Sequence, residues 1–279
     1  MSSVTQRINE IKQPYGGYIK PSQFTKIEFV DDVELHTKEN MHPTNIGLVV
    51  DYLTRFMIGT QKEEAFIISL TGANVAESNG MQGSLQIAKS LLDNIIELDN
   101  QSIINACKLT SFDCWYRNIT TAESALKWNQ IWPNQDTIDN IRTMVARSIR
   151  FFEQYGPIIQ DGFTFEPPQP SKRLYLALLL NKITQYGGYT STVTSGDGDF
   201  LTDDTLRDFK VSKSSPTSKH TLQLIMYWIM GQYSGQEIFK NITKVGLFNP
   251  RLNTAYLLRI TDVDDQILQT IEKNVICYK

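Results

Sequence analysis

The chain has 279 residues, of which 41% are hydrophobic and 20% are charged. This balance is typical of a globular protein and excludes an intrinsically disordered chain. The formal net charge is −3, so any nucleic acid must be bound by a local groove, because the chain lacks bulk positive charge. The three cysteines, Cys107, Cys114 and Cys277, have no C-x-x-C spacing. They argue against a disulfide framework or a zinc site and favour a reducing compartment.

Membrane and export signals are not expected in this chain. Residues 1–13 have neither the apolar stretch nor the cleavage motif of a signal peptide. The longest apolar run, residues 174–180, is too short to cross a bilayer. We therefore expect a cytoplasmic protein with no membrane partner.

The region 1–155 is predicted to be mainly helical. Residues 1–40 are polar and rich in turn signals, with one possible strand at 26–30. From Thr44 onward, apolar residues recur at helical spacing. The predicted helices cover residues 44–57, 63–70, 83–97, 102–114 and 136–155.

The region 156–279 has shorter apolar segments that are typical of strands. Residues 171–183 fit either a short helix or an apolar insertion. The order of elements predicts an α/β (α+β) core in which helices pack around a mixed sheet. Strands are predicted at 162–166, 189–193, 198–201 and 205–211, then a helix at 217–231, a hairpin of 244–248 with 254–260, and a last helix at 264–275.

A hairpin in this second region carries a cluster of acids. If residues 203–204 form its turn, symmetric pairing places Asp199 opposite Asp208 and Asp197 opposite Lys210. Opposed Cβ atoms in an antiparallel pair lie about 4.5–5.5 Å apart. Two carboxylates this close require a cation between them or a bound proton. A divalent metal fits, because hard cations bind carboxylate oxygens.

Strand periodicity adds a lysine to this face of the hairpin. Asp208 and Lys210 are two residues apart and project to the same side, whereas Phe209 points to the other. Asp197 either joins the acids or pairs with Lys210. The alternative is a solvated hairpin with a surface ion pair.

The next predicted helix carries two polar residues among apolar neighbours. Gln223 and Tyr227 are four residues apart, so they share one face of the helix and point back over the sheet. Polar groups in such surroundings need hydrogen-bond partners. The alternative is a polar pair that caps the core of an amphipathic helix.

Together these residues form the pattern Gly-x-x-Asp, Asp-x-Lys and Gln-x-x-x-Tyr, which resembles the RecB-like branch of the PD-(D/E)XK nucleases. The resemblance covers about residues 162–278 and implies a restriction-endonuclease-like core. It also implies metal-dependent hydrolysis of DNA, with exonuclease favoured over endonuclease, RNA open as a substrate, and a phage or mobile-element setting. The three motifs stand at Gly196–Asp199, Asp208–Lys210 and Gln223–Tyr227.

The resemblance also implies roles for individual residues. Asp199, Asp208 and the backbone carbonyl of Phe209 would bind Mg²⁺ or Mn²⁺, which activates a water and neutralises charge on the phosphate. Lys210 would orient the attacking water or stabilise the pentacoordinate phosphate. The pair on the helix, Gln223 and Tyr227, would position the substrate strand or Lys210.

Two further acids have counterparts in relatives. Glu166 matches an acid on the first core strand, and Asp51 stands on a helix where relatives often carry histidine. Asp51 equally fits an ordinary helix-face residue. Some relatives carry an iron–sulfur cluster on four cysteines, which we do not expect here because three badly spaced cysteines are too few.

Several basic residues are candidates for contacts with nucleic-acid phosphate. The alternatives are a mobile solvated loop for the lysines, a solvated residue at the start of a helix for His220, and a structural hairpin turn for Arg251. The rival function is a catalytically inactive module of the same fold that binds nucleic acid or protein. A homo-oligomer or partner-protein contact through the apolar run 174–180 is also open. The candidates are Lys213, Lys219, His220 and Arg251.

Overall fold

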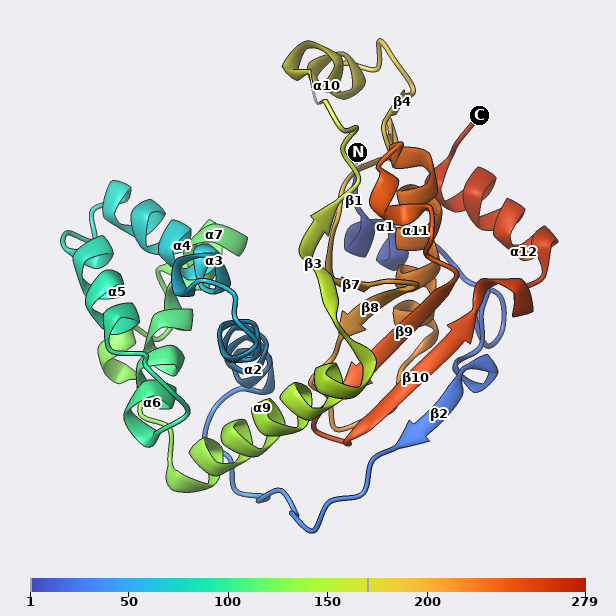
Figure 1. The fold of residues 1–279 in the computed structure, drawn as a ribbon. Coiled ribbons are helices and arrows are strands. Elements are labelled where there is room, and N and C mark those ends of the chain that lie inside the picture. Colours follow the sequence, from blue (N-terminus) through green and yellow to red (C-terminus); the bar gives the residue numbers. More distant parts are fainter. Residues whose placement is uncertain (1, 170) are drawn as a thin grey trace.

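The centre of the molecule is a six-stranded mixed sheet in the order β2-β10-β9-β8-β7-β3 (Figure 1). The computed structural model describes residues 2–169 and 171–279. Strands β8 and β9 are parallel, and every other neighbouring pair is antiparallel. The predicted mixed sheet flanked by helices is therefore confirmed. The strands are β2 (Thr25–Glu28), β3 (Ile158–Thr164), β7 (Asp197–Thr202), β8 (Thr205–Phe209), β9 (Lys244–Asn249) and β10 (Thr254–Arg259).

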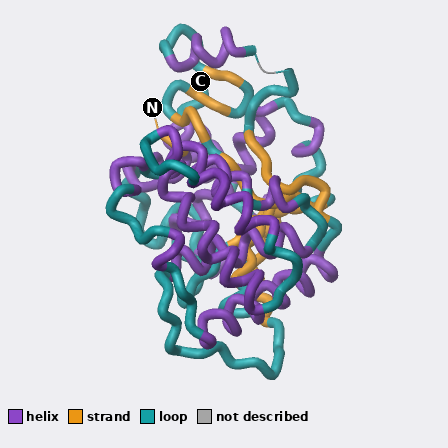
Figure 2. The backbone as a smooth tube through the Cα atoms, turned by 90° about the vertical axis from the view of Figure 1, so that its left-hand side faces the viewer, coloured by secondary structure: helices purple, strands orange, loops and turns teal. Residues whose placement is uncertain are grey.

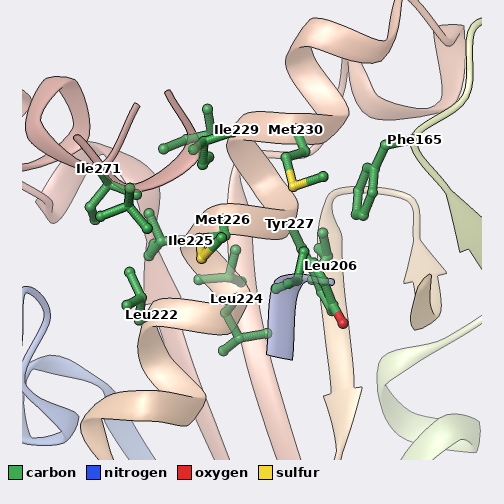
Figure 3. Close-up of a cluster of buried hydrophobic side chains, with 14 of the residues drawn as sticks. Phe165, Leu206, Leu222, Leu224, Ile225, Met226, Tyr227, Ile229, Met230 and Ile271 are labelled. Atoms are coloured by element: carbon green, nitrogen blue, oxygen red, sulfur yellow. The ribbon is translucent and has the colours of Figure 1, made fainter. Parts of the chain in front are cut away.

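One face of the sheet is covered by α11 (Ser218–Ser234), which connects β8 to β9. A crossover of this kind returns the chain in the same direction, which makes the two strands parallel. Figure 3 shows the apolar side chains of α11 gathered near Leu206 of β8 and Phe165. Also in this layer are α1 (Val4–Glu10), α12 (Asp265–Thr270) and a π-helical turn, Ile271–Ile276.

The other face of the sheet is covered by α9 (Gln135–Tyr155) and α2 (Pro43–Met57). Phe151 of α9 stacks on Phe248 of β9, with ring centroids 4.1 Å apart. The α2 helix packs against α9 and separates the sheet from a lobe of short helices (Figure 1). Residues of α2 can therefore reach both the sheet and the lobe.

The lobe contains most of the predicted helices, but with different ends. The expected helix 63–70 is split at the buried Phe66, whose ψ of 22° departs from helical geometry. The expected helices 83–97 and 102–114 also end earlier than predicted. The helices here are α3 (Lys62–Ala65), α4 (Ile67–Ser78), α5 (Ser84–Asp93), α6 (Asn100–Leu109), α7 (Asp113–Arg117) and α8 (Ile119–Ala122).

The N-terminal segment belongs to the C-terminal core. Strand β2 pairs with β10, and β1 (Ser2–Ser3) pairs with β6 (Val193–Ser195). Helix α1 packs against α11. Residues from both sides of the expected boundary near residue 155 therefore pack together. Residues 29–42 then run along the molecule to α2 (Figure 1).

Residues 171–183 contain a helix, α10 (Lys172–Leu179), so the open alternative resolves in favour of a helix. It stands away from the body of the molecule in Figures 1 and 2. Two short strands follow it, β4 (Gln185–Tyr186) and β5 (Tyr189–Thr190). Over residues 2–169 and 171–279, no helix has both the length and the apolar character needed to cross a membrane.

Candidate active site

The β7–β8 hairpin has the predicted register. Phe200 pairs with Arg207 and Leu201 pairs with Leu206, as expected for a turn at residues 203–204. One step further along, the backbone amide of Phe209 donates a hydrogen bond to Asp199 Oδ2 at 2.7 Å. The local pattern of the sequence was sufficient to predict this part of the site.

Asp208 is a buried carboxylate, only 4% exposed. Its Oδ2 forms an ion pair with Lys210 Nζ at 2.7 Å. Burial, reinforced by Asp199 and opposed by Lys210, raises the pKa of Asp208 to about 7. The alternative of a solvated surface pair is wrong for this residue.

Lys210 pairs with Asp208, and the exposed Asp197 is among the residues that line the cleft. Burial acts to lower the pKa of Lys210, but the carboxylates of Asp208, Asp199 and Asp51 outweigh it and raise that pKa. The ammonium therefore stays charged at neutral pH, which suits a group that contacts phosphate.

Arg55 of α2 ties three carboxylates together. Its Nε lies 2.9 Å from Asp51 Oδ1, its Nη1 contacts Asp161 of β3, and its Nη2 lies 3.6 Å from Asp199 Oδ1. The guanidinium also lies over the ring of Phe200, 4.5 Å from its centroid. Sequence analysis missed both Arg55 and Asp161. The spacing of four between Asp51 and Arg55 was an available signal, whereas Asp161 lay outside the predicted strand.

The two further acids predicted for the site, Asp51 and Glu166, differ in where the structure places them. Asp51 joins the cluster, and burial, together with Asp199 and Asp161 and against Arg55, raises its pKa to about 6. Glu166 lies beyond the end of β3, is exposed and does not line the cleft. The first core strand instead contributes Asp161, because β3 begins and ends earlier than predicted.

Gln223 and Tyr227 of α11 contact each other and line the cleft. Gln223 Nε2 donates a hydrogen bond to Tyr227 Oη at 2.8 Å. Figure 3 shows the Tyr227 ring beside Leu206 with its hydroxyl oxygen at the outer end. Burial, reinforced by the nearby Asp208, raises the pKa of this hydroxyl well above its usual value. Tyr227 therefore remains a neutral hydrogen-bond donor.

These side chains surround a cleft of about 620 Å³ between the sheet, α2 and the helical lobe. A second cavity of about 860 Å³ adjoins it and shares Arg55, Glu64, Ile67 and Gly162 with it. The first cleft contains both the acidic cluster and the polar pair of α11, so it is the candidate active site. Its charged lining includes Asp51, Arg55, Arg117, Asp199, Asp208 and Lys210.

Three of the four predicted phosphate contacts lie on the surface outside the lining of this cleft. Lys213 lies 4.0 Å from Glu39, and Lys219 donates to Asn9 Oδ1 at 2.7 Å. His220 Nδ1 accepts a hydrogen bond from the Thr217 amide at 3.2 Å. Burial, together with the charge of Lys210, lowers the pKa of His220.

For Arg251 the structure favours the structural-turn alternative. Its side chain is buried, and both terminal nitrogens bind Glu39, at 3.0 and 2.8 Å. The pair fixes the segment before α2 to the β9–β10 turn, so this arginine stabilises the fold and does not face a ligand.

The acidic cluster has an excess of negative charge, because four carboxylates share two cations. Within the described parts of the chain, no three Asp, Glu, His or Cys side chains form a group that could hold a metal as they stand. Arg55 lies among three of the acids, which separates them. The acids are Asp51, Asp161, Asp199 and Asp208, and the cations are Arg55 and Lys210.

Comparison with known proteins adds no relative. No family model, no curated protein and no solved structure matches the chain. The chemistry of the cleft must therefore be argued from its own residues.

Proposed function

We propose that the chain is a Mg²⁺- or Mn²⁺-dependent nuclease that hydrolyses phosphodiester bonds of DNA. The observation that carries this proposal is the buried carboxylate of Asp208, which lies near Asp199 and forms an ion pair with Lys210. A buried carboxylate is costly unless a cation or hydrogen bonds compensate it. The fold buries the Asp208 carboxylate at the point where a second carboxylate and a lysine converge. This combination of groups is typical of a metal-assisted phosphodiesterase.

The residues fit a divalent cation in type and in charge. Asp199, Asp208 and the carbonyl of Phe209 are oxygen donors of the kind that Mg²⁺ and Mn²⁺ prefer. Asp51 adds a carboxylate whose pKa is raised by burial and by the neighbouring acids. A bound divalent ion supplies a water of lowered pKa and neutralises charge on the phosphate.

The chain's own groups then act on the substrate. Lys210, kept charged by the surrounding acids, donates hydrogen bonds to a non-bridging phosphate oxygen and stabilises the negative charge that develops there. Tyr227 accepts a hydrogen bond from Gln223, so its own hydroxyl hydrogen is directed elsewhere and can donate into the cleft. Gln223 thereby acts as a positioning residue for Tyr227.

The order of elements supports the same proposal. Three antiparallel strands, β3, β7 and β8, precede the α11 crossover to the parallel strand β9. This agrees with the strand and helix order of the RecB-like PD-(D/E)XK nucleases, on which the resemblance in part rests.

The test is cleavage of linear, circular and single-stranded DNA and of RNA, each with Mg²⁺, Mn²⁺ or EDTA. We expect metal-dependent cleavage that Asp208→Asn abolishes. Asp204→Asn is the matched control, because Asp204 pairs with Lys244 at the other end of the same hairpin. Cleavage of linear but not circular DNA identifies an exonuclease.

Inert protein with every substrate and metal overturns the proposal. If that protein still binds DNA without taking up Mn²⁺, the rival function, an inactive binding module of the same fold, replaces it.

A further inference from the structure

Arg117, at the end of α7 in the helical lobe, lines the cleft. Its side chain is 50% exposed, in contrast to Arg55, which is 14% exposed and bound to acids of the cluster. Lys210 is likewise tied to Asp208. Arg117 is therefore the cation on the lobe side of the cleft that is open to a ligand from solvent.

Arg117 is supported from behind by a buried polar network. Its Nη2 donates to Tyr52 Oη at 3.1 Å, and its Nε lies 3.5 Å from Asp113 Oδ2. Asp113 is buried and also accepts hydrogen bonds from Tyr52 Oη at 2.7 Å and Ser69 Oγ at 2.5 Å. These contacts occupy only part of a guanidinium that carries five N–H donors, and they orient the remainder.

The same helix sets the position of Arg117 relative to the acidic cluster. Tyr52 and Asp51 are neighbours on α2, and their side chains serve the two walls of the cleft. Asp51 contacts Arg55 in the acidic cluster, whereas Tyr52 contacts Arg117 and Asp113 in the lobe. Helix α2 thus fixes the position of Arg117 relative to the candidate reaction centre.

We propose that Arg117 binds a phosphate group of the substrate strand other than the one that is cleaved. This inference rests on the proposed nuclease function and adds a substrate contact to it. An arginine fork is suited to phosphate, because its planar donors match two oxygens at once. The group bound is either an internal phosphodiester or a terminal phosphate, and both present the same oxygens.

The test is binding of fluorescent oligonucleotides in EDTA, where no cleavage occurs, at several salt concentrations. Arg117→Ala is expected to bind about tenfold more weakly. The slope of log K against log salt should become shallower by about 0.7–0.9, because one phosphate contact is lost. Arg117→Lys should recover the slope but only part of the affinity. A structural role alone would not change the slope.

Arg150→Ala is the matched control. Arg150 is 58% exposed and also pairs with a carboxylate, Asp31, at 3.1 Å, but it lies outside the cleft. We expect wild-type affinity and slope from it. If Arg117→Ala keeps the wild-type slope, or if wild type binds no oligonucleotide, the inference is overturned.

Oligonucleotides with 5′-phosphate, 3′-phosphate or hydroxyl ends, and circular single strands, identify which phosphate is bound. A loss confined to one phosphorylated end assigns a terminal phosphate, and a loss shared by circular strands assigns an internal one. A chain that binds through Arg117 but cleaves nothing refutes the nuclease proposal and retains this inference. A chain that cleaves DNA but binds it equally well without Arg117 refutes this inference and retains the nuclease proposal.

Discussion

At the scale of single residues, the site depends on carboxylates that are held where charge is costly. Asp208 is buried beside Asp199, and the Lys210 ammonium compensates its charge at 2.7 Å. The shifted pKa values of Asp208 and Asp51 follow from burial and from the neighbouring acids. Both shifts connect the ionisation of the site to the stability of the fold.

Stability without metal should therefore depend on Asp208 in a defined pH range. The pKa of Asp208 is raised from 3.8 to about 7 on folding, so the folded chain binds the proton more tightly. Its contribution is fully stabilising below about pH 4 and is lost as the pH rises through 7. In EDTA, the stability of Asp208→Asn relative to wild type should be about 3 kcal/mol greater at pH 8 than at pH 4.5.

Thermal unfolding of both proteins at the two pH values measures this difference. Asp204→Asn is the control, because its Lys244 partner lowers the pKa of Asp204, opposite to the shift of Asp208. An identical Tm difference between wild type and Asp208→Asn at both pH values would contradict the burial argument.

The affinity for a divalent metal should increase with pH. A carboxyl group binds metal only after losing its proton, and the pKa values of Asp208 and Asp51 are about 7 and about 6. The affinity for Mn²⁺ should rise at least about tenfold from pH 5 to 7 and then level off. Calorimetric titration measures it. An affinity that is constant from pH 5 to 8 would argue against ligation by these acids.

At the scale of elements, α2 joins the parts of the site. Through Arg55 it contacts β3 and β7, and through Tyr52 it contacts α7. The contacts of Arg55 with β3 and β7 link residues that lie more than a hundred positions apart in the sequence. The position of α2 therefore determines whether the acids of the sheet and the lobe arginine share one cleft.

Removal of Arg55 should destabilise the fold strongly. Arg55→Ala leaves three carboxylates without their shared cation, and loss of one partner of a buried pair costs about 3 kcal/mol. Mn²⁺ or a pH near 5 should restore part of the stability, because either neutralises the acids. Chemical denaturation with and without Mn²⁺ tests this.

The exposed Arg150 serves as the comparison, because its partner Asp31 is also bound by Arg147, and Arg150→Ala should lose less than about 1 kcal/mol. Equal losses for the two arginine variants would show that the cluster around Arg55 is not strained by charge.

The parts of the site that sequence analysis predicted are local. The hairpin register follows from its turn, and the helical face of Gln223 and Tyr227 follows from their spacing. Asp161 and Arg117 were missed because their roles depend on how β3 and α7 pack against α2. No spacing in the chain encodes such contacts between distant segments.

At the scale of the whole molecule, the sheet is completed and covered by the N-terminal region. Strand β2 forms its edge beside β10, and α9 and α2 cover the face that contains Phe200, Phe209 and Phe248. The mixed fold class was predictable from the order of elements. The pairing of β2 with β10 was not, because strand pairing between distant segments leaves no mark in local composition.

The fragment 156–279 should therefore not fold alone. It lacks β2, α9 and α2, so an apolar face of the sheet and the edge of β10 would be exposed. We expect aggregation or a molten state without a cooperative thermal transition in near-ultraviolet circular dichroism, whereas the full chain unfolds cooperatively. A sharp transition in the fragment would show that the sheet is stable without its N-terminal cover.

The central claim is that Lys210 and its acids cleave phosphodiesters, and the most direct test compares two matched lysines. Lys210 and Lys244 are 29% and 31% exposed and lie 2.7 and 2.6 Å from Asp208 and Asp204. The measurement is the single-turnover rate of DNA cleavage with Mn²⁺ for wild type, Lys210→Gln and Lys244→Gln. We predict a loss of about 100-fold or more in Lys210→Gln and a near wild-type rate in Lys244→Gln. Equal rates in all three proteins, or no cleavage by wild type, would contradict the account.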